Sequence, residues 1–192
     1  MNIFVLDNNP KIAAEMMCDK HIVKMIIESC QILSAVIDNR YVIPFTVTLK
    51  DIPSKAYKLP QYPKAHVKHP CTIWAMESSA NAQWLLEHLI GLCDEFSKRY
   101  PRKQHKLADA HILYKLILKQ CEFPSNTLTT FVQAMPAPYK TDNAVEAYRN
   151  YYLMDKTFAA WKTTPPAWFK SGKAKILNMV REHNQAWTHL HS

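Results

Sequence analysis

Apolar side chains recur at helical spacing near the start of the chain. Between Asn9 and Ile37 one face of the pattern is apolar, with a period near 3.6 residues. Pro10 suits the first turn of a helix, because its missing N–H needs no partner there. The opposite face is polar within an arc of about 100°. It carries Lys20, His21, Lys24, Glu28 and Gln31. The pattern predicts an amphipathic helix that presents cations, a histidine and a carboxylate together.

Four more segments have a helical signature further along the chain. We expect helices at about 71–99, 106–120, 143–161 and 172–191. Pro70 and Pro101 bound the first of these. Asp142 or Asn143 is expected to cap the third, and Asn143 with Glu146 has the spacing of a capping box. The sequence therefore predicts an all-α fold, a compact single-domain bundle of about five helices.

The segment from residue 38 to residue 70 breaks this regularity. It contains five prolines and five lysines. Residues 41–48 are rich in β-branched and aromatic side chains, which favour strands. We interpret residues 38–70 as a basic, irregular insertion that can hold a short β-hairpin. It would lie within one nucleic-acid-binding domain covering residues 1–192.

Glycine and cysteine usage narrows the possible functions. Only two glycines occur in 192 residues, which excludes glycine-rich nucleotide-binding loops and disfavours an all-β fold. The five cysteines are widely spaced without a CxxC pair, so we expect free, mostly buried thiols. The chain has no long apolar stretch and no basic-apolar leader. We expect a cytoplasmic protein without a membrane span.

Positive charge is concentrated in two places. The net charge is +8, and the runs 98–106 and 163–181 contain basic residues and no acid. Both runs also contain aromatic rings. Cations that neutralise phosphates, beside rings that stack on bases, are typical of nucleic-acid binding, with a solvated basic surface as the alternative. The residues expected to contact nucleic acid are Lys20, His69, Arg99, Arg102, Lys103, Arg149, Trp168, Lys170 and Lys173.

His66, His69 and Cys71 have the residue types and close spacing of metal ligands. A zinc site needs three or four convergent ligands, and no second paired cluster occurs in the sequence. We therefore expect no metal ion and no cofactor.

Two motifs resemble a known enzyme family. Asp19-Lys20-His21-Ile22, with Glu28 seven residues after His21, resembles the first helix of the phage pyrimidine-dimer DNA glycosylase (endonuclease V) family. The segment 166–174 is similar to a Pro-Thr-Trp-Tyr-Lys segment near the other end of that family. Shorter matches resemble uncharacterised phage and bacterial proteins grouped with it, and they lie at 69–74, 93–95 and 148–149. The resemblance spans most of the chain as separate islands.

The resemblance implies a DNA N-glycosylase, with AP-lyase activity in addition, that removes a damaged or modified pyrimidine from duplex DNA. In that family a base is flipped, an amine attacks C1′ to form an imine, and a glutamate stabilises the sugar cation. Glu28 would be that glutamate and His21 would support the site. A phage-encoded protein acting in a host cell fits this function. Two alternatives stay open: a non-catalytic nucleic-acid-binding protein of the same fold, and an enzyme that acts on modified bases by another reaction.

The nucleophile is expected at the N-terminus. Imine formation needs a neutral amine, and an α-amine with a pKa of about 7.7–8 is partly neutral at pH 7, unlike a lysine near 10.4. Met1 is therefore the first candidate. Lys20 or Lys24 could replace it only if burial or neighbouring cations lowered its pKa. Met1-Asn2 stands where the family exposes a threonine amine, and two family arginines are Ile27 and Gln31 here.

Overall fold

The computed structural model describes residues 1–40 and 66–190, which form seven α-helices and no β-strand. The helices are α1 (Pro10–Glu15), α2 (Asp19–Arg40), α3 (Pro70–Glu77), α4 (Ser79–Arg99), α5 (Ala110–Leu118), α6 (Ala144–Asp155) and α7 (Ala167–Leu190), with a 3₁₀ turn, η2 (Ala137–Tyr139), before α6. None of these helices is both long and apolar enough to cross a membrane. The all-α prediction is confirmed, whereas the expected number of helices is too low.

Two of the expected helices are each split in two. Ser78 has extended backbone angles, and its Oγ accepts a hydrogen bond from the N–H of Asn81 at 3.0 Å, so α4 begins with its own cap. Between α1 and α2, Arg99 donates to the carbonyl oxygens of Glu15 and Met17, each at 2.8 Å. These side chains satisfy backbone groups that a continuous helix would pair internally. The spacing of apolar residues gives no indication of side chains that bind backbone groups in this way.

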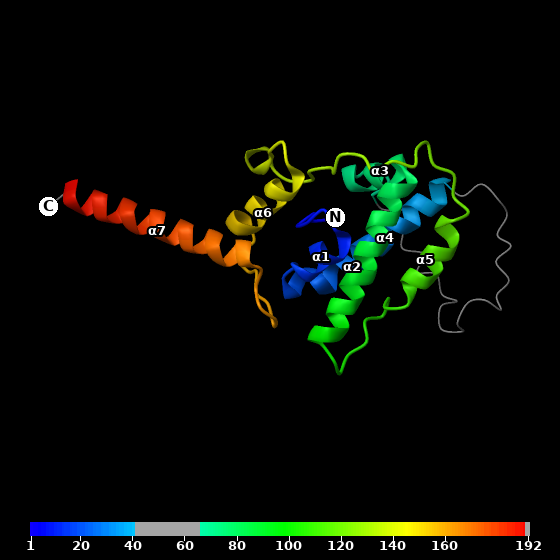
Figure 1. The fold of residues 1–192 in the computed structure, drawn as a ribbon, viewed down its shortest axis with the longest axis horizontal. Helices are drawn as coiled ribbons and strands as arrows, with labels where there is room; N and C mark the ends of the chain where they lie inside the picture. Colours follow the sequence, from blue (N-terminus) through cyan, green and yellow to red (C-terminus); the bar gives the residue numbers. More distant parts are fainter. Residues whose placement is uncertain (41–65, 191–192) are drawn as a thin grey trace.

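The centre of the fold is the packing of α2 against α4 (Figure 1). α1 lies against α4, while α3 and α5 contact both central helices. The extended segment Asn2–Leu6 runs through the same core, where Ile3, Val5 and Leu6 are fully buried. This path brings the N-terminus of the chain against α2.

The remaining helix ends differ from the predictions by a few residues. Of the two expected caps, Asn143 is the one that caps α6, its Oδ1 accepting from the N–H of Glu146 at 3.2 Å. α6 ends at Asp155 rather than near residue 161. α7 begins at Ala167, directly after Pro166, and projects from the rest of the structure (Figure 1).

The expected insertion at 38–70 is only partly described. Residues 38–40 belong to α2 rather than to an irregular segment, because the helix continues to Arg40. Pro70 begins α3. The predicted hairpin at 41–48 lies outside the described residues. The single domain over residues 1–192 stays a prediction.

Candidate active site

The carboxylate of Glu28 is buried and surrounded by nitrogen atoms. The residue is 7% exposed on α2. The backbone N–H of Asn2 donates to its Oε2 at 2.8 Å, and the α-amine nitrogen of Met1 lies 3.9 Å from the same oxygen. Nζ of Lys24 lies 3.1 Å from Oε1. These three nitrogen groups compensate the burial of the carboxylate and fix its position.

The segment Asn2–Leu6 holds Met1 beside Glu28. Oδ1 of Asn2 accepts from the N–H groups of Ile3 at 2.8 Å and Phe4 at 3.2 Å, and its Nδ2 donates to the carbonyl of Ala134 at 2.8 Å. Phe4 has a φ of 40°, a left-handed conformation that is costly for a bulky residue. This buried segment thus places the α-amine. The first candidate nucleophile and the candidate carboxylate are brought together.

Lys24 is less suited to be the nucleophile. Its side chain is 68% exposed and its Nζ is paired with Oε1 of Glu28, so it lacks burial, one of the two conditions expected to favour a lysine nucleophile. Lys20, one turn earlier on α2, is also exposed. Both lysines supply positive charge at the site.

His21 is buried beside the Glu28 site and is uncharged at neutral pH. Its Nδ1 is hydrogen-bonded to the hydroxyl of Tyr152, and its ring stacks on Phe4 with centroids 4.4 Å apart. Burial, followed by the positive charges of Lys156 and Lys24, lowers the pKa of His21 to about 4. His21 therefore holds neighbouring rings in place as a neutral imidazole. Its support of catalysis stays a prediction.

A pocket of about 440 Å³ opens over this group of residues. Among its charged and aromatic lining residues, three were not identified from the sequence, and they are Phe4, Lys156 and Phe158. Lys156 and Phe158 directly follow the end of α6, and a lysine close to an aromatic ring is the kind of pair that drew attention to Trp168. A lysine and an aromatic ring also lie close together at Lys156 and Phe158, but no family motif includes these two residues.

His69 approaches the site from the start of α3. Its Nδ1 accepts the N–H of Cys71 at 3.1 Å and so caps the helix. Burial, and then the charge of the N-terminal amine and His66, lowers the pKa of His69, while Glu28 opposes this shift. In addition, Thr72 donates to Sδ of Met1 at 3.7 Å. The start of α3 therefore packs beside the N-terminus, and contact of His69 with nucleic acid stays a prediction.

The basic residues expected to contact nucleic acid do not all have the same surroundings. Lys20, Arg102, Lys103 and Lys170 are exposed. Lys173 is half-buried, and its Nζ donates to the carbonyl of Leu153 at 2.8 Å, near the end of α6. The exposed residues are accessible to phosphates, and their role stays a prediction.

The structure corrects the prediction for Arg99, whose side chain is fully buried. Its guanidinium lies 2.8 Å from Glu95 and 3.1 Å from Asp19, and it also donates to two backbone carbonyls of the α1–α2 break. A guanidinium with these internal partners is not free to bind DNA phosphates. The surrounding run of basic residues suggested that Arg99 is exposed on a basic surface. Instead, Glu95 four residues earlier and the backbone carbonyls between α1 and α2 bind its guanidinium in the interior.

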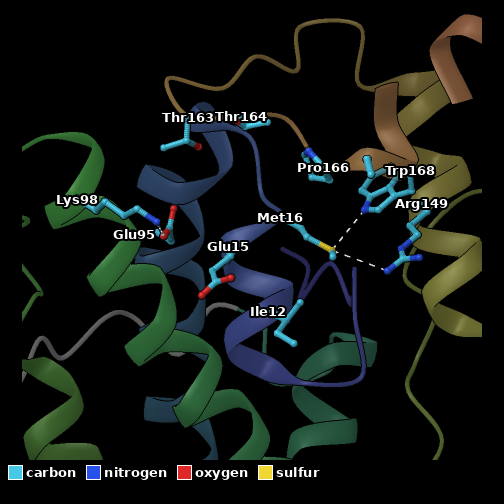
Figure 2. A pocket seen from close by; sticks show the side chains of 11 residues that line it. Ile12, Glu15, Met16, Glu95, Lys98, Arg149, Thr163, Thr164, Pro166 and Trp168 are labelled. Carbon is cyan, nitrogen blue, oxygen red and sulfur yellow. Dashed lines mark hydrogen bonds and ion pairs between the residues drawn. The ribbon is translucent and has the colours of Figure 1, made fainter. Parts of the chain in front are cut away.

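Trp168 and Arg149 lie together beside Met16, and Figure 2 shows both directed at its sulfur. Nε1 of Trp168 donates to that sulfur at 3.3 Å, and the guanidinium of Arg149 lies 5.4 Å from the indole centroid. They line a pocket of about 790 Å³ that shares no lining residue with the Glu28 pocket. Arg149 also donates to the carbonyl of Leu6 at 2.9 Å. Both residues thus have internal contacts, and their binding of nucleic acid stays a prediction.

All five cysteines are free thiols and four are buried, as predicted. Burial raises the pKa of Cys71 and of Cys93 to about 12, so these thiols stay protonated and unreactive. The rings of His66 and His69 are 6.5 Å apart. Within residues 1–40 and 66–190, no three His, Cys, Asp or Glu side chains converge on a possible metal site.

Comparison with known proteins identifies one family. A family model for pyrimidine dimer DNA glycosylases matches residues 1–108, more than half of the 192-residue chain. The matched region contains Met1, His21 and Glu28. No curated protein and no solved structure matches the chain.

Proposed function

The chain belongs to the pyrimidine dimer DNA glycosylase family, and on this basis we propose which of its residues perform the glycosylase reaction. Glu28 is the catalytic carboxylate, the α-amine of Met1 is the nucleophile, and the substrate is a damaged or modified pyrimidine in duplex DNA. The observation that carries this proposal is the 3.9 Å separation of the amine nitrogen from Oε2 of Glu28, inside a pocket. AP-lyase activity is part of the proposal.

The reaction begins when the neutral amine attacks C1′ of the target nucleotide. A nitrogen–C1′ bond forms, the glycosidic bond breaks, and the departing base takes up a proton. Positive charge develops on the sugar during this step, and the fixed carboxylate of Glu28 stabilises it electrostatically.

The lyase step follows from the covalent intermediate. The nitrogen loses one proton, and opening of the sugar ring with protonation of O4′ gives the protonated imine. Glu28 is close enough to the nitrogen to take up that proton and deliver it. Loss of a proton from C2′ then expels the 3′-phosphate and cuts the strand. Hydrolysis of the remaining imine frees the amine.

The test is a base-release and incision assay on a panel of duplexes. The panel carries a pyrimidine dimer, an abasic site, uracil, or a hydroxymethylated or glucosylated cytosine. Wild-type protein should release one of these bases, and Glu28→Gln should lose at least about 100-fold in rate while still binding the duplex. Glu122→Gln, the same change at an exposed carboxylate, is the matched control and should leave the rate unchanged. Equal rates for wild type and Glu28→Gln would overturn the proposed role.

A further inference from the structure

The Glu28 pocket has a second wall, formed by the α6–α7 connector (residues 156–166). Two connector residues, Lys156 and Phe158, line the pocket together with Met1 and Glu28. The family match ends at residue 108, so it says nothing about them. The glycosylase motif on α2 does not explain what they do at the site.

Phe158 is held at the rim of the pocket with much of its ring uncovered. It is 41% exposed. Its ring meets His21 edge-on with centroids 5.5 Å apart, and Nζ of Lys20 lies 4.9 Å from its centroid. A positioned but uncovered aromatic face gains apolar contact only when something stacks on it.

Lys156 is held inside the pocket rather than at its rim. Its side chain is 13% exposed, and its Nζ lies 3.9 Å from the centroid of Tyr151 and 2.8 Å from Oδ2 of Asp155. Nζ of Lys156 also lies 6.0 Å from the ring centroid of Phe4. These contacts hold an ammonium group in the lining of the pocket that Glu28 also lines.

The described lining residues together fit one nucleotide. Glu28 is the one acid among them, against three lysines, so the pocket attracts an anion. Two of the lining rings, those of Tyr151 and Phe158, are not buried and provide flat surfaces, whereas Phe4 and His21 are buried and stacked on each other. The volume of about 440 Å³ lies within the roughly 300–1,000 Å³ of small-molecule pockets. A base with its phosphate combines the two required features, a flat ring and negative charge.

We propose that the α6–α7 connector holds the target nucleotide, drawn out of the duplex, over Glu28. Phe158 stacks on its base, and Lys156 binds an adjoining phosphate. This inference rests on the proposed function and specifies how that site recognises its substrate. Phe158 then contributes only when a base is present, whereas Lys156 contributes with or without one.

The first test compares two duplexes that differ only in the base. One is the panel duplex from which wild-type protein releases a base, and the other has an abasic site at the same position. Phe158→Ala should slow single-turnover base release about ten-fold or more, yet leave borohydride trapping on the abasic duplex within about two-fold. Phe158→Trp should restore base release. Leu128→Ala, at a residue 45% exposed and outside the pocket, should change neither readout.

The second test addresses the phosphate. Lys156→Met should weaken binding to both duplexes and lower the dependence of log Kd on log salt by about one, whereas Lys115→Met, at an exposed lysine on α5, should not. The inference is overturned if Phe158→Ala slows base release and borohydride trapping equally, or slows neither. The proposed function survives that result as long as Glu28→Gln still abolishes base release. A wild-type protein that acts on no duplex overturns the proposed function, and this inference with it.

Discussion

The backbone nitrogen of Asn2 lies 2.8 Å from Oε2 of Glu28, closer than the α-amine nitrogen of Met1 at 3.9 Å. Two successive nitrogen atoms of the chain therefore reach the same carboxylate. With Met1 in place, the Asn2 N–H orients Glu28, and under the proposed function the Met1 amine is the nucleophile. If Met1 were removed, the nitrogen of Asn2 would become the free amine at the shorter distance.

This relationship predicts that the reaction needs a free N-terminal amine. A short peptide fused ahead of Met1 should reduce borohydride trapping on an abasic duplex by about 100-fold, because an amide nitrogen is not a nucleophile. Proteolytic removal of the peptide should restore trapping. Tandem mass spectrometry of the reduced adduct should place the sugar on the first residue. An adduct on Lys20 or Lys24 would contradict the prediction and assign the nucleophile to α2.

A second prediction separates Arg99 from its neighbour Arg102. Arg99→Met should lower the free energy of unfolding by about 3–5 kcal/mol, because it leaves Glu95 and Asp19 buried or half-buried without their partner. Arg102→Met should change stability by less than about 0.5 kcal/mol but reduce the salt dependence of DNA binding by about one. Urea unfolding and binding titrations at several salt concentrations measure both. A stable Arg99→Met with weakened DNA binding would restore the surface role expected from the sequence.

The α2 part of the site was predictable because helical spacing alone places its residues. His21, Lys24 and Glu28 lie on one helix, so their periodicity fixes a common face. The two extra helix breaks were not predictable from periodicity, since they depend on one cap at Ser78 and on the distant side chain of Arg99.

The rest of the pocket depends on tertiary packing. Met1 reaches Glu28 only because Asn2–Leu6 is buried along α2, and Lys156 and Phe158 arrive from beyond α6. A local sequence pattern does not predict contacts between segments that are far apart in the sequence. The family resemblance supplied the proposed role of Glu28, but not the connector residues that line the same pocket.

A third prediction concerns the close contact of α1 with α4. A Cβ on Gly91 would lie 3.0 Å from Cβ of Ala14 and 3.2 Å from Cα of Lys11. Gly91→Ala should therefore destabilise the protein by about 1 kcal/mol, because crowding against backbone costs more than the roughly 1 kcal/mol that alanine gains in helix propensity. Gly172→Ala is the control, since its Cβ would meet only the flexible end of Leu153. Urea midpoints should fall further for Gly91→Ala than for Gly172→Ala, and the reverse order would contradict this packing.

The fourth prediction follows from His88, which is fully buried on α4. Its ring stacks on Trp84 with centroids 5.1 Å apart, and neither ring nitrogen has a hydrogen-bond partner among the described residues. Burial lowers the pKa of His88 to about 3, well below its value near 6.5 in an unfolded chain. Between these pH values the unfolded state binds more protons than the folded state. The stability contributed by the neutral ring is therefore complete above pH 6.5 and is lost as pH falls toward 3.

His88→Phe should remove this pH dependence while keeping the stacked ring. Near pH 7 the variant should be within about 1.5 kcal/mol of wild type, because phenylalanine has a similar shape and no unpaired nitrogen. Between pH 7 and pH 4.5, the free energy of unfolding should fall by up to about 3 kcal/mol more for wild type than for His88→Phe. This difference comes from the two pH units between 6.5 and 4.5, at about 1.36 kcal/mol each. His111→Phe, at a half-buried position on α5, is the matched control. Urea unfolding at the two pH values measures the difference. Parallel losses in wild type and His88→Phe would mean that His88 is not the group being protonated, leaving His21, whose pKa is lowered to about 4, as the next buried histidine to replace.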